Sequence, residues 1–328
     1  MTNMHPKTRR DVVKAIVAAS VATSLPSSFA AEKKVRVAAL FDGPITDKNW
    51  AQFGYDGLLQ VKKNMGWDIA YTDRLTIDQY AEVLRNYARE GFDRVVGHSG
   101  GFMEPALEVA SEFPNTQFIV INGQKTNSKN ITSYIEDAYE QGYLMGALAA
   151  LVTKTKKVAQ VQGDNIPVEV WSEQGTEAAI KQLMPDVTFR VVSTGSWTDA
   201  NKAREAAVAL IQSGVDVLIP SGGGQLDIGT FTAAEDKKVM LIGNSADPSN
   251  VAPNATIGIL GLDVTKLFYT AASSQPDGKV HKLGIKAGIL SMSVTPGKAP
   301  QPVIDKVNQI SRDLSEGKLQ HVEIGEKQ

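Results

Sequence analysis

Short apolar runs alternate with longer amphipathic segments along most of the chain. The apolar runs are rich in β-branched residues, as buried strands are, and cover 35–41, 69–71, 94–97, 118–121 and 158–162. The longer segments have the apolar spacing of helices and cover 49–65, 77–89, 104–112 and 136–152. Strands that alternate with helices in this way predict parallel sheets with helices on both faces.

The chain also contains two similar segments. Gly91–Val96 leads to the turn Gly100-Gly101, and Gly214–Ile219, which begins 123 positions later, leads to Gly223-Gly224. Each copy has the pattern of a glycine, a strand and a glycine-rich turn. A period this long is not that of a solenoid. It predicts two similar α/β lobes of about 120 residues each, with chance similarity between two ordinary βαβ units as the alternative.

The predicted fold is therefore α/β, with two similar doubly wound parallel-sheet lobes and a ligand cleft between them. No long Pro/Gly/Ser linker separates the halves, so we expect short hinge crossings near Ser133–Tyr134 and Ile257–Gly261. The first lobe is expected to hold residues 31–134 and about 258–284, and the second lobe 135–257 and about 285–328.

The first thirty residues have a different pattern. Arg9 and Arg10 precede an apolar run over 15–25, and Ser28-Phe29-Ala30 is a small-x-small cleavage site. The run is too short to span a bilayer, so residues 1–30 are interpreted as an export signal, cleaved near Ala30. The paired arginines resemble the twin-arginine signal, and an ordinary secretory signal is the alternative. Both predict a periplasmic protein.

Charge and composition exclude several classes of protein. The chain carries a formal net charge of −2, and without the +3 of residues 1–30 the remainder carries −5. No basic surplus is left to neutralise nucleic-acid phosphates. The absence of cysteine excludes disulfides, thiolate metal sites and a lipid anchor on an N-terminal cysteine. We expect a monomer that is not embedded in a membrane, with a small-molecule ligand and neither metal nor cofactor.

Small residues collect where the predicted strands end. In open parallel sheets, ligands bind beyond the carboxyl ends of the strands. The first copy places Ser99 and Gly100 there, and the second places Gly223 in the run 221–224. Small residues let backbone amides approach a ligand closely. The alternative is that each glycine only turns the chain.

Three of the four tryptophans stand in loops or at helix starts near the predicted cleft. They are Trp50, Trp171 and Trp197, whereas Trp67 opens a strand and suits packing. A ring stacked on a flat ligand contributes about 1–3 kcal/mol, and core packing is the alternative for each. Asp47, which precedes Trp50, is a second candidate, although it also suits a helix cap.

Several segments together resemble the basic membrane protein family. Asp47-Lys48-Asn49-Trp50, Glu140–Ala147 and Gly195–Asp199, with the run Ala206–Gly224 behind it, stand in the order and spacing of that family. The family is a branch of the type I periplasmic binding proteins and includes the purine nucleoside receptor lipoproteins of ABC importers. The resemblance covers nearly all of residues 35–325.

The resemblance implies a purine nucleoside or related base between the lobes, held by aromatic rings, and delivery to ABC transporter permease subunits. It also exposes departures from the family pattern. Asn49 stands where serine is usual, and Asn122 stands where aspartate is usual. Asn244-Ser245 replaces a pair whose second residue, at the position of Ser245, is an aspartate that typically binds ribose hydroxyls. Ser245 cannot grip a diol with two oxygens. We therefore hypothesise a purine base or similar heterocycle with more acceptors than donors, rather than a whole nucleoside.

The candidate ligand-binding residues are Asp47, Asn49, Trp50, Ser99, Gly100, Asn122, Trp171, Trp197, Gly223, Asn244 and Ser245. A nucleosidase-like hydrolase is one alternative function, but no serine-hydrolase or zinc-protease motif is present. His98 is the one histidine at a strand end, and it suits a buried imidazole with satisfied hydrogen bonds. A periplasmic sensor-type protein that presents its ligand to a receptor is the other alternative.

Overall fold

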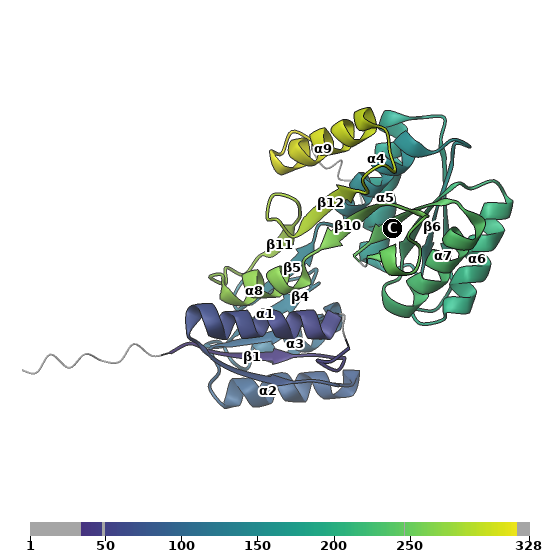
Figure 1. Cartoon of the computed structure of the whole chain (residues 1–328). Helices are drawn as coiled ribbons and strands as arrows, with labels where there is room; N and C mark the ends of the chain where they lie inside the picture. Colours follow the sequence, from purple (N-terminus) through teal and green to yellow (C-terminus); the bar gives the residue numbers. More distant parts are fainter. Residues whose placement is uncertain (1–33, 48–49, 246, 320–328) are drawn as a thin grey trace, which may run out of the picture. The chain divides into compact units, whose positions relative to one another are not determined.

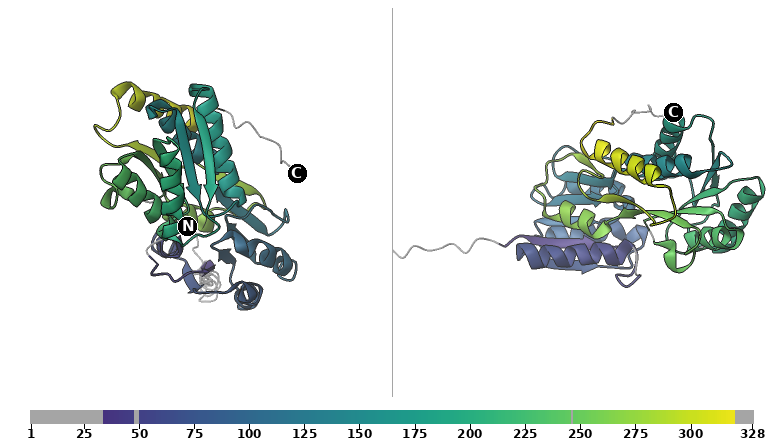
Figure 2. Two further views of the ribbon diagram at one scale, coloured as in Figure 1. Left: turned by 90° about the vertical axis from the view of Figure 1, so that its right-hand side faces the viewer. Right: turned by 45° about the horizontal axis from the view of Figure 1, so that its top comes forward.

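The two halves of the chain build two separate six-stranded sheets with corresponding strand orders. The computed structural model describes residues 34–47, 50–245 and 247–319 (Figures 1 and 2). The first sheet has the order β11-β5-β4-β3-β1-β2, and the second has the order β12-β10-β9-β8-β6-β7. Each strand of the first sheet thus has a counterpart in the second. The predicted α/β class with two similar lobes is confirmed.

The strands of the first sheet are β1 (Arg36–Leu40), β2 (Asp68–Thr72), β3 (Arg94–Gly97), β4 (Gln117–Ile121), β5 (Ile131–Glu136) and β11 (Val280–Leu283). Those of the second are β6 (Lys157–Gln162), β7 (Thr188–Ser193), β8 (Val217–Ser221), β9 (Met240–Asn244), β10 (Thr256–Leu262) and β12 (Leu290–Val294). All described pairs are parallel except β10 with β12, which is antiparallel.

The helices of the first lobe are α1 (Trp50–Met65), η1 (Ile77–Gln79), α2 (Tyr80–Arg89), η2 (Gly100–Phe102), α3 (Met103–Ala110) and α8 (Val264–Ser273). Those of the second are α4 (Ala138–Val152), α5 (Pro167–Leu183), α6 (Ala200–Gln212), α7 (Gly224–Lys237), η3 (Pro248–Asn250) and α9 (Gln301–Ser315). Aspartates cap α4, α6 and α8: the side chains of Asp137, Asp199 and Asp263 accept backbone N–H groups of the first turn.

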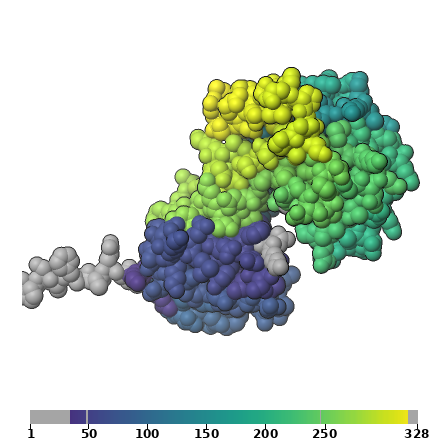
Figure 3. Space-filling model, in the orientation of Figure 1, coloured from purple at the N-terminus to yellow at the C-terminus, as the bar shows by residue number. Residues whose placement is uncertain are grey.

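Side-chain alternation along β1 assigns a separate core to each face of the first sheet. Val37 and Ala39 pack with α1 and α8, whereas Ala38 and Leu40 pack with α2 and α3. Although far apart in sequence, α8 and α1 lie against each other (Figure 3). The second sheet repeats this arrangement, with α4, α5 and α9 on one face and α6 and α7 on the other.

Helices α4 and α5 approach each other unusually closely. A Cβ added to Gly142 would overlap the carbonyl oxygen of Ser172, and one added to Gly175 would overlap that of Tyr139. Thr176 donates its hydroxyl to the carbonyl of Gly142 at 3.0 Å. Glycine is therefore required at this contact, because any side chain would push the two helices apart.

The chain crosses between the sheets three times. Ser133–Tyr134, expected to be a crossing, lies inside β5, and Ile257–Gly261 lies inside β10 of the second sheet. The expected assignment of residues from 258 onward to the first lobe is therefore wrong for β10. The crossings follow β5, β10 and β11, and they bond to one another: Asp137 N–H donates to Leu283 at 3.0 Å, and Asp263 N–H donates to Ile289 at 2.8 Å.

The expected export signal, residues 1–30, lies outside the described residues, as does the end of the second lobe, 320–328. Of the helices that the structure describes, none has both the length and the apolar character needed to cross a bilayer. 

Candidate functional site

A cavity of about 510 Å³ lies where both lobes contribute residues, a volume in the range of small-molecule sites. From the first lobe it is lined by residues that follow β1, β3 and β4, among them Trp50, Ser99, Gly100 and Asn122. From the second lobe it is lined by Ile166–Val168, at the start of α5. Four of the predicted site residues therefore share one cavity.

The Trp50 ring is held on the buried imidazole of His98. The two rings are stacked with centroids 4.6 Å apart. The Trp50 indole N–H donates to the His98 carbonyl at 2.9 Å, and His98 Nε2 donates to the Trp50 carbonyl at the same distance. His98 Nδ1 is buried without a hydrogen-bond partner, so the expected full satisfaction of this imidazole is not observed. Burial lowers the His98 pKa to about 4, so the ring under Trp50 is neutral at physiological pH.

Ser99, Gly100 and Asn122 form one wall through short backbone contacts. The Ser99 hydroxyl accepts the Gly101 N–H at 3.1 Å and so begins the helical turn η2. A Cβ on Gly100 would lie 2.8 Å from the carbonyl oxygen of Asn122, so glycine allows the two loops to meet. Asn122 adopts a left-handed backbone with φ of 58°, which asparagine tolerates better than most residues. Ser245, 123 positions later, repeats this conformation with φ of 63°.

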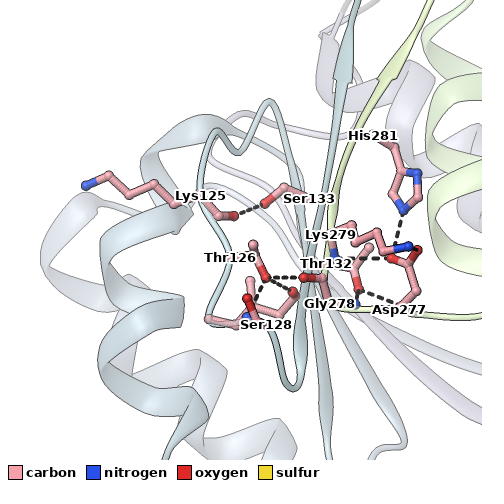
Figure 4. A network of polar contacts seen from close by, with 10 residues as sticks. Lys125, Thr126, Ser128, Thr132, Ser133, Asp277, Gly278, Lys279 and His281 are labelled. Carbon is pink, nitrogen blue, oxygen red and sulfur yellow. Dashed lines mark hydrogen bonds and ion pairs between the residues drawn. The ribbon is translucent and has the colours of Figure 1, made fainter.

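The loop after Asn122 is tied to the segment that precedes β11 (Figure 4). The Thr132 hydroxyl accepts the N–H groups of Asp277 and Gly278 at 3.1 and 3.0 Å. The Thr126 hydroxyl lies 2.7 Å from the Gly278 carbonyl, and Ser133 donates to the Lys125 carbonyl at 2.6 Å. These bonds connect the cavity loop and β5 to the segment that precedes β11, all within the first lobe.

Consecutive hydrogen bonds link buried polar side chains at the carboxyl ends of the second-lobe strands. Asn244 accepts from Gln141 and donates to the Ser221 hydroxyl at 3.1 Å. Ser221 in turn donates to Glu169 at 2.5 Å. Ser245 is exposed and lies 3.3 Å from the Asn244 side-chain oxygen. The predicted pair Asn244-Ser245 is thus brought to the strand ends, but neither residue lines the cavity around Trp50.

The glycine-rich turn of the second lobe uses its amides internally. The Gly222 and Gly223 N–H groups each donate to the Asp227 carboxylate at 3.0 Å. Asp227 is buried, and this burial raises its pKa to about 7. The Gly223 amide, which was expected to approach a ligand, thus already has the Asp227 carboxylate as its acceptor, and a role of Gly223 in ligand binding stays a prediction.

The other two candidate tryptophans lie away from the cavity lining. The Trp197 ring covers Gly163 so closely that a Cβ there would overlap it, and 38% of the side chain is exposed. Lys282 of β11 lies over the Trp171 ring, with Nζ 5.4 Å from its centroid. Trp171 therefore contacts a residue of the other lobe without lining the cavity.

Asp47 acts as a helix cap. Its carboxylate accepts the N–H groups of Ala51 and Gln52 at 3.1 Å each, which places Trp50 at the start of α1. Asn49 lies outside the described residues. 

Sequence reasoning missed two carboxyl groups next to the cavity. Glu136 ends β5 beside Asn122, and Glu169 follows the cavity-lining Val168. Burial raises the pKa of Glu136 to about 7 and that of Glu169 to about 8, and the charge of Glu136 adds to the rise at Glu169. The position of Glu136 at the end of a strand was the available signal. Within the described ranges, no three His, Cys, Asp or Glu side chains are grouped as a metal site requires.

Comparison with known proteins gives consistent matches across the chain. Residues 34–328 match the sequence model of the family described as Bmp, ABC transporter substrate-binding protein PnrA-like. The chain is 25% identical over 270 residues to a purine-binding protein of Brucella abortus (80% of this chain, 76% of that protein). It is 25% identical over 303 residues to the ABC transporter nucleoside-binding protein BmpA of Lactococcus lactis (84% and 85%).

A solved structure has the same architecture. The solute-binding protein of an ABC transporter system from Conexibacter woesei superposes with a TM-score of 0.68 at 25% identity, covering 88% of this chain and 98% of that one. 

Proposed function

Because the chain belongs to the Bmp family of PnrA-like ABC transporter substrate-binding proteins, we propose that it captures a purine-like base or nucleoside and delivers it to an importer. The purine-binding and nucleoside-binding relatives support this ligand class. Delivery would take place in the periplasm, through contact with permease subunits. 

The observation that carries the proposal is the supported Trp50 ring in the cavity wall. One face of the ring is covered by His98, and the residue also lines a cavity large enough for a drug-sized ligand. The two hydrogen bonds to His98 fix the ring before any ligand arrives. A preorganised aromatic surface binds flat ligands with little loss of side-chain entropy.

We favour a base over a whole nucleoside. In the family that the sequence resembles, an aspartate that typically binds ribose hydroxyls stands at the position of Ser245, and another aspartate is usual at the position of Asn122. Neither side chain accepts two hydroxyl donors as a carboxylate does. An aromatic ring without ribose needs no such acceptors.

Ligand capture would proceed by population shift. Three crossings join the lobes, and a ligand that contacts both lobes favours the arrangement in which they are closed. The cavity already receives residues from each lobe, with Trp50 on one side and Ile166–Val168 on the other. An importer would then recognise the closed form.

Calorimetric titration with adenine, hypoxanthine, adenosine, inosine and glucose tests the ligand class. We expect micromolar or tighter binding of a base and weaker binding of its nucleoside, because the ribose lacks carboxylate partners. Preference for nucleosides would discard the choice of a base, and preference for glucose would discard the purine class.

Variants locate the site. Trp50→Ala is expected to weaken base binding by about tenfold or more, since stacking contributes about 1–3 kcal/mol. Trp197→Ala tests whether the exposed second-lobe ring also meets the ligand. Trp67→Phe is the control, because Trp67 lies under the Arg94 guanidinium, partly buried against the core of the first lobe and outside the cavity lining. Unchanged affinity in both alanine variants would show that the ligand binds elsewhere.

We propose that the ligand leaves the site unaltered. Overnight incubation with adenosine or inosine, followed by chromatography, should return the nucleoside intact, and free base in the product would instead indicate a hydrolase. Uptake of labelled base by cells with and without this protein separates transport from presentation to a sensor.

A further inference from the structure

The two oxygens of the Glu169 carboxyl have different surroundings. Oε2 accepts the Ser221 hydroxyl at 2.5 Å and the Gln160 side-chain amide at 3.4 Å. Oε1 has no hydrogen-bond partner among the described residues. Glu169 is only partly buried, and its Oε1 remains open to solvent, unlike the unpaired side-chain oxygen of Gln160, which is buried. One carboxyl oxygen is therefore available to a ligand.

The hydrogen bonds behind Oε2 fix this oxygen as an acceptor. Gln141 donates to the Asn244 amide oxygen, and the Asn244 amide nitrogen donates to the Ser221 hydroxyl at 3.1 Å. Because Ser221 accepts that bond, its own proton is directed to Glu169 Oε2. Gln141, Asn244 and Ser221 are all buried, so water does not compete for these bonds. Recognition of a ligand is left to Oε1.

Glu169 lies where the strand ends of the two lobes meet. Ser221 ends β8 of the second sheet, and Val168, the residue before Glu169, lines the cavity together with Trp50 of the first lobe. Glu136, which ends β5 of the first sheet, is close enough for its charge to raise the Glu169 pKa. Glu169 itself does not line the cavity in this arrangement of the lobes. A ligand that draws the lobes together around the Trp50 ring would bring its free edge towards this carboxyl.

We propose that Glu169 Oε1 accepts an N–H group of the bound base, and that the site thereby selects purines that carry an exocyclic amino group. The inference rests on the proposed function for the ligand class and adds the group that the second lobe recognises. An aromatic amino group donates hydrogen bonds, whereas a ring carbonyl accepts them. An unpaired carboxylate oxygen distinguishes the two, because it binds the donor through a charge-assisted hydrogen bond and repels the acceptor. The carboxylates lost from the family pattern had instead suggested a ring richer in acceptors.

Glu169→Gln should reverse this preference. Ser221 and Gln160 both direct donors at the position of Oε2, so the amide oxygen of the glutamine takes that position. Its NH₂ group then occupies the position of Oε1 and faces the ligand. The variant should prefer a ring carbonyl over an amino group, which a carboxyl with a purely structural role would not predict.

The pH dependence of binding gives a second readout. Burial raises the Glu169 pKa to about 8, although the Ser221 hydrogen bond opposes the rise. The charged neighbours are all acidic and add to it: Asp227 of α7, Glu173 of α5 and Glu136 of β5. Because Oε2 already accepts two donors, the proton resides on Oε1, where it prevents that oxygen from accepting an N–H group. The affinity for an aminopurine should therefore fall below pH 8, by up to about tenfold per pH unit.

Calorimetric titration at pH 8 with adenine, 6-methylpurine and hypoxanthine tests the inference. In 6-methylpurine a methyl group of similar size replaces the amino group of adenine, and in hypoxanthine a carbonyl replaces it. The wild type should bind adenine at least about tenfold more tightly than 6-methylpurine, as one charge-assisted hydrogen bond allows. Glu169→Gln should lose this difference and bind hypoxanthine more tightly than adenine. Between pH 8 and pH 6, the wild type should lose affinity for adenine but not for 6-methylpurine.

Glu177→Gln is the matched control, because it makes the same change at an exposed position of α5 and should retain the wild-type order of affinities. If Glu169→Gln does not fold, Glu169→Ala replaces it and should bind adenine and 6-methylpurine equally. Wild-type protein that binds these two bases equally, or a Glu169 variant that binds adenine as tightly as the wild type, overturns the inference and leaves the proposed function standing. Wild-type protein that binds none of the three bases overturns the proposed function as well.

Discussion

The indole of Trp50 lies flat on the imidazole of His98, with the two ring planes 11° from parallel. The two residues are 48 positions apart, and each bonds to the backbone carbonyl of the other. His98 follows β3, and Trp50 begins α1, so the pair connects the strand end to the helix that carries the cavity wall. The orientation of the ring that would meet a ligand is thus set by a neutral, buried histidine.

Replacing His98 should loosen this ring. His98→Ala removes the stacking partner and a hydrogen bond, and aromatic pairs contribute about 0.5–1.5 kcal/mol beyond their buried area. We expect base affinity to fall by a few-fold to tenfold in calorimetry, together with a lower melting temperature. His281→Ala, which alters a histidine on β11 outside the cavity, is the control and should retain full affinity. If His98→Ala and the wild type bound the base with equal affinity, the orientation that His98 gives to the Trp50 ring would not matter for binding.

The contact between α4 and α5 makes the stability of the second lobe sensitive to a single methyl group. Gly142→Ala places a Cβ against the carbonyl of Ser172, and overpacking of this kind typically costs about 1–3 kcal/mol. Chemical denaturation should show that loss in the free energy of unfolding. At Gly43 a Cβ would meet only ordinary contacts of 3.4 Å or more, so Gly43→Ala serves as the control. Comparable losses in both variants would argue against the close helix contact.

Removing the Thr132 hydroxyl should weaken the link between β5 and the segment that precedes β11 (Figure 4). In Thr132→Val the N–H groups of Asp277 and Gly278 lose their acceptor, and an unpaired buried donor costs about 1–3 kcal/mol. Hydrogen exchange should accelerate at these two amides. Thr188→Val, at an exposed position of β7, should change little, and unchanged exchange in Thr132→Val would show that the link is not formed.

Buried acids should make the protein more stable at pH 6 than at pH 8. Burial raises the pKa of Glu169 to about 8 and that of Asp227 to about 7, as it raises that of Glu136. Between their unfolded values, near 4, and these folded values, the native state binds more protons than the unfolded state. The free energy of unfolding therefore decreases as the pH rises through this range, by about 1.4 kcal/mol per pH unit for each proton of difference.

The His98 pKa shift acts at lower pH and with the opposite sign. Because its folded pKa is about 4, the unfolded state takes up the proton first, and the contribution of His98 to stability falls as the pH drops from about 6.5 towards 4. Below about pH 6.5 this single proton opposes the three protons of the buried acids, so the melting temperature should still fall as the pH rises from about 5 to 8, but less steeply below pH 6.5 than above it. Asp227→Asn should reduce the fall in melting temperature between pH 6 and pH 8. A melting temperature that rises over this range in the wild-type protein would contradict the raised acid pKa values.

Local patterning was sufficient for much of the fold. Apolar β-branched runs placed β1, β3 and β4 within two residues of their observed bounds, because buried parallel strands need continuous apolar sequence. The repeat of glycine, strand and glycine-rich turn predicted two lobes, and the matching left-handed residues Asn122 and Ser245 show how far that repeat extends. Because β5 contains polar residues, the sequence did not indicate a strand there, and the first crossing was predicted at a position that lies inside β5.

Which residues meet at the site was decided by tertiary structure. Periodicity placed Trp50, Ser99, Gly100 and Asn122 at strand ends, and parallel sheets bring strand ends together, so these four share one cavity. The sequence does not tell whether a tryptophan faces a ligand or a glycine, as at Trp197, or whether a glycine amide is already bonded, as at Gly223. It also does not tell that Glu136 is buried. Burial and partner choice depend on segments distant in the chain, and only folding brings those segments into contact.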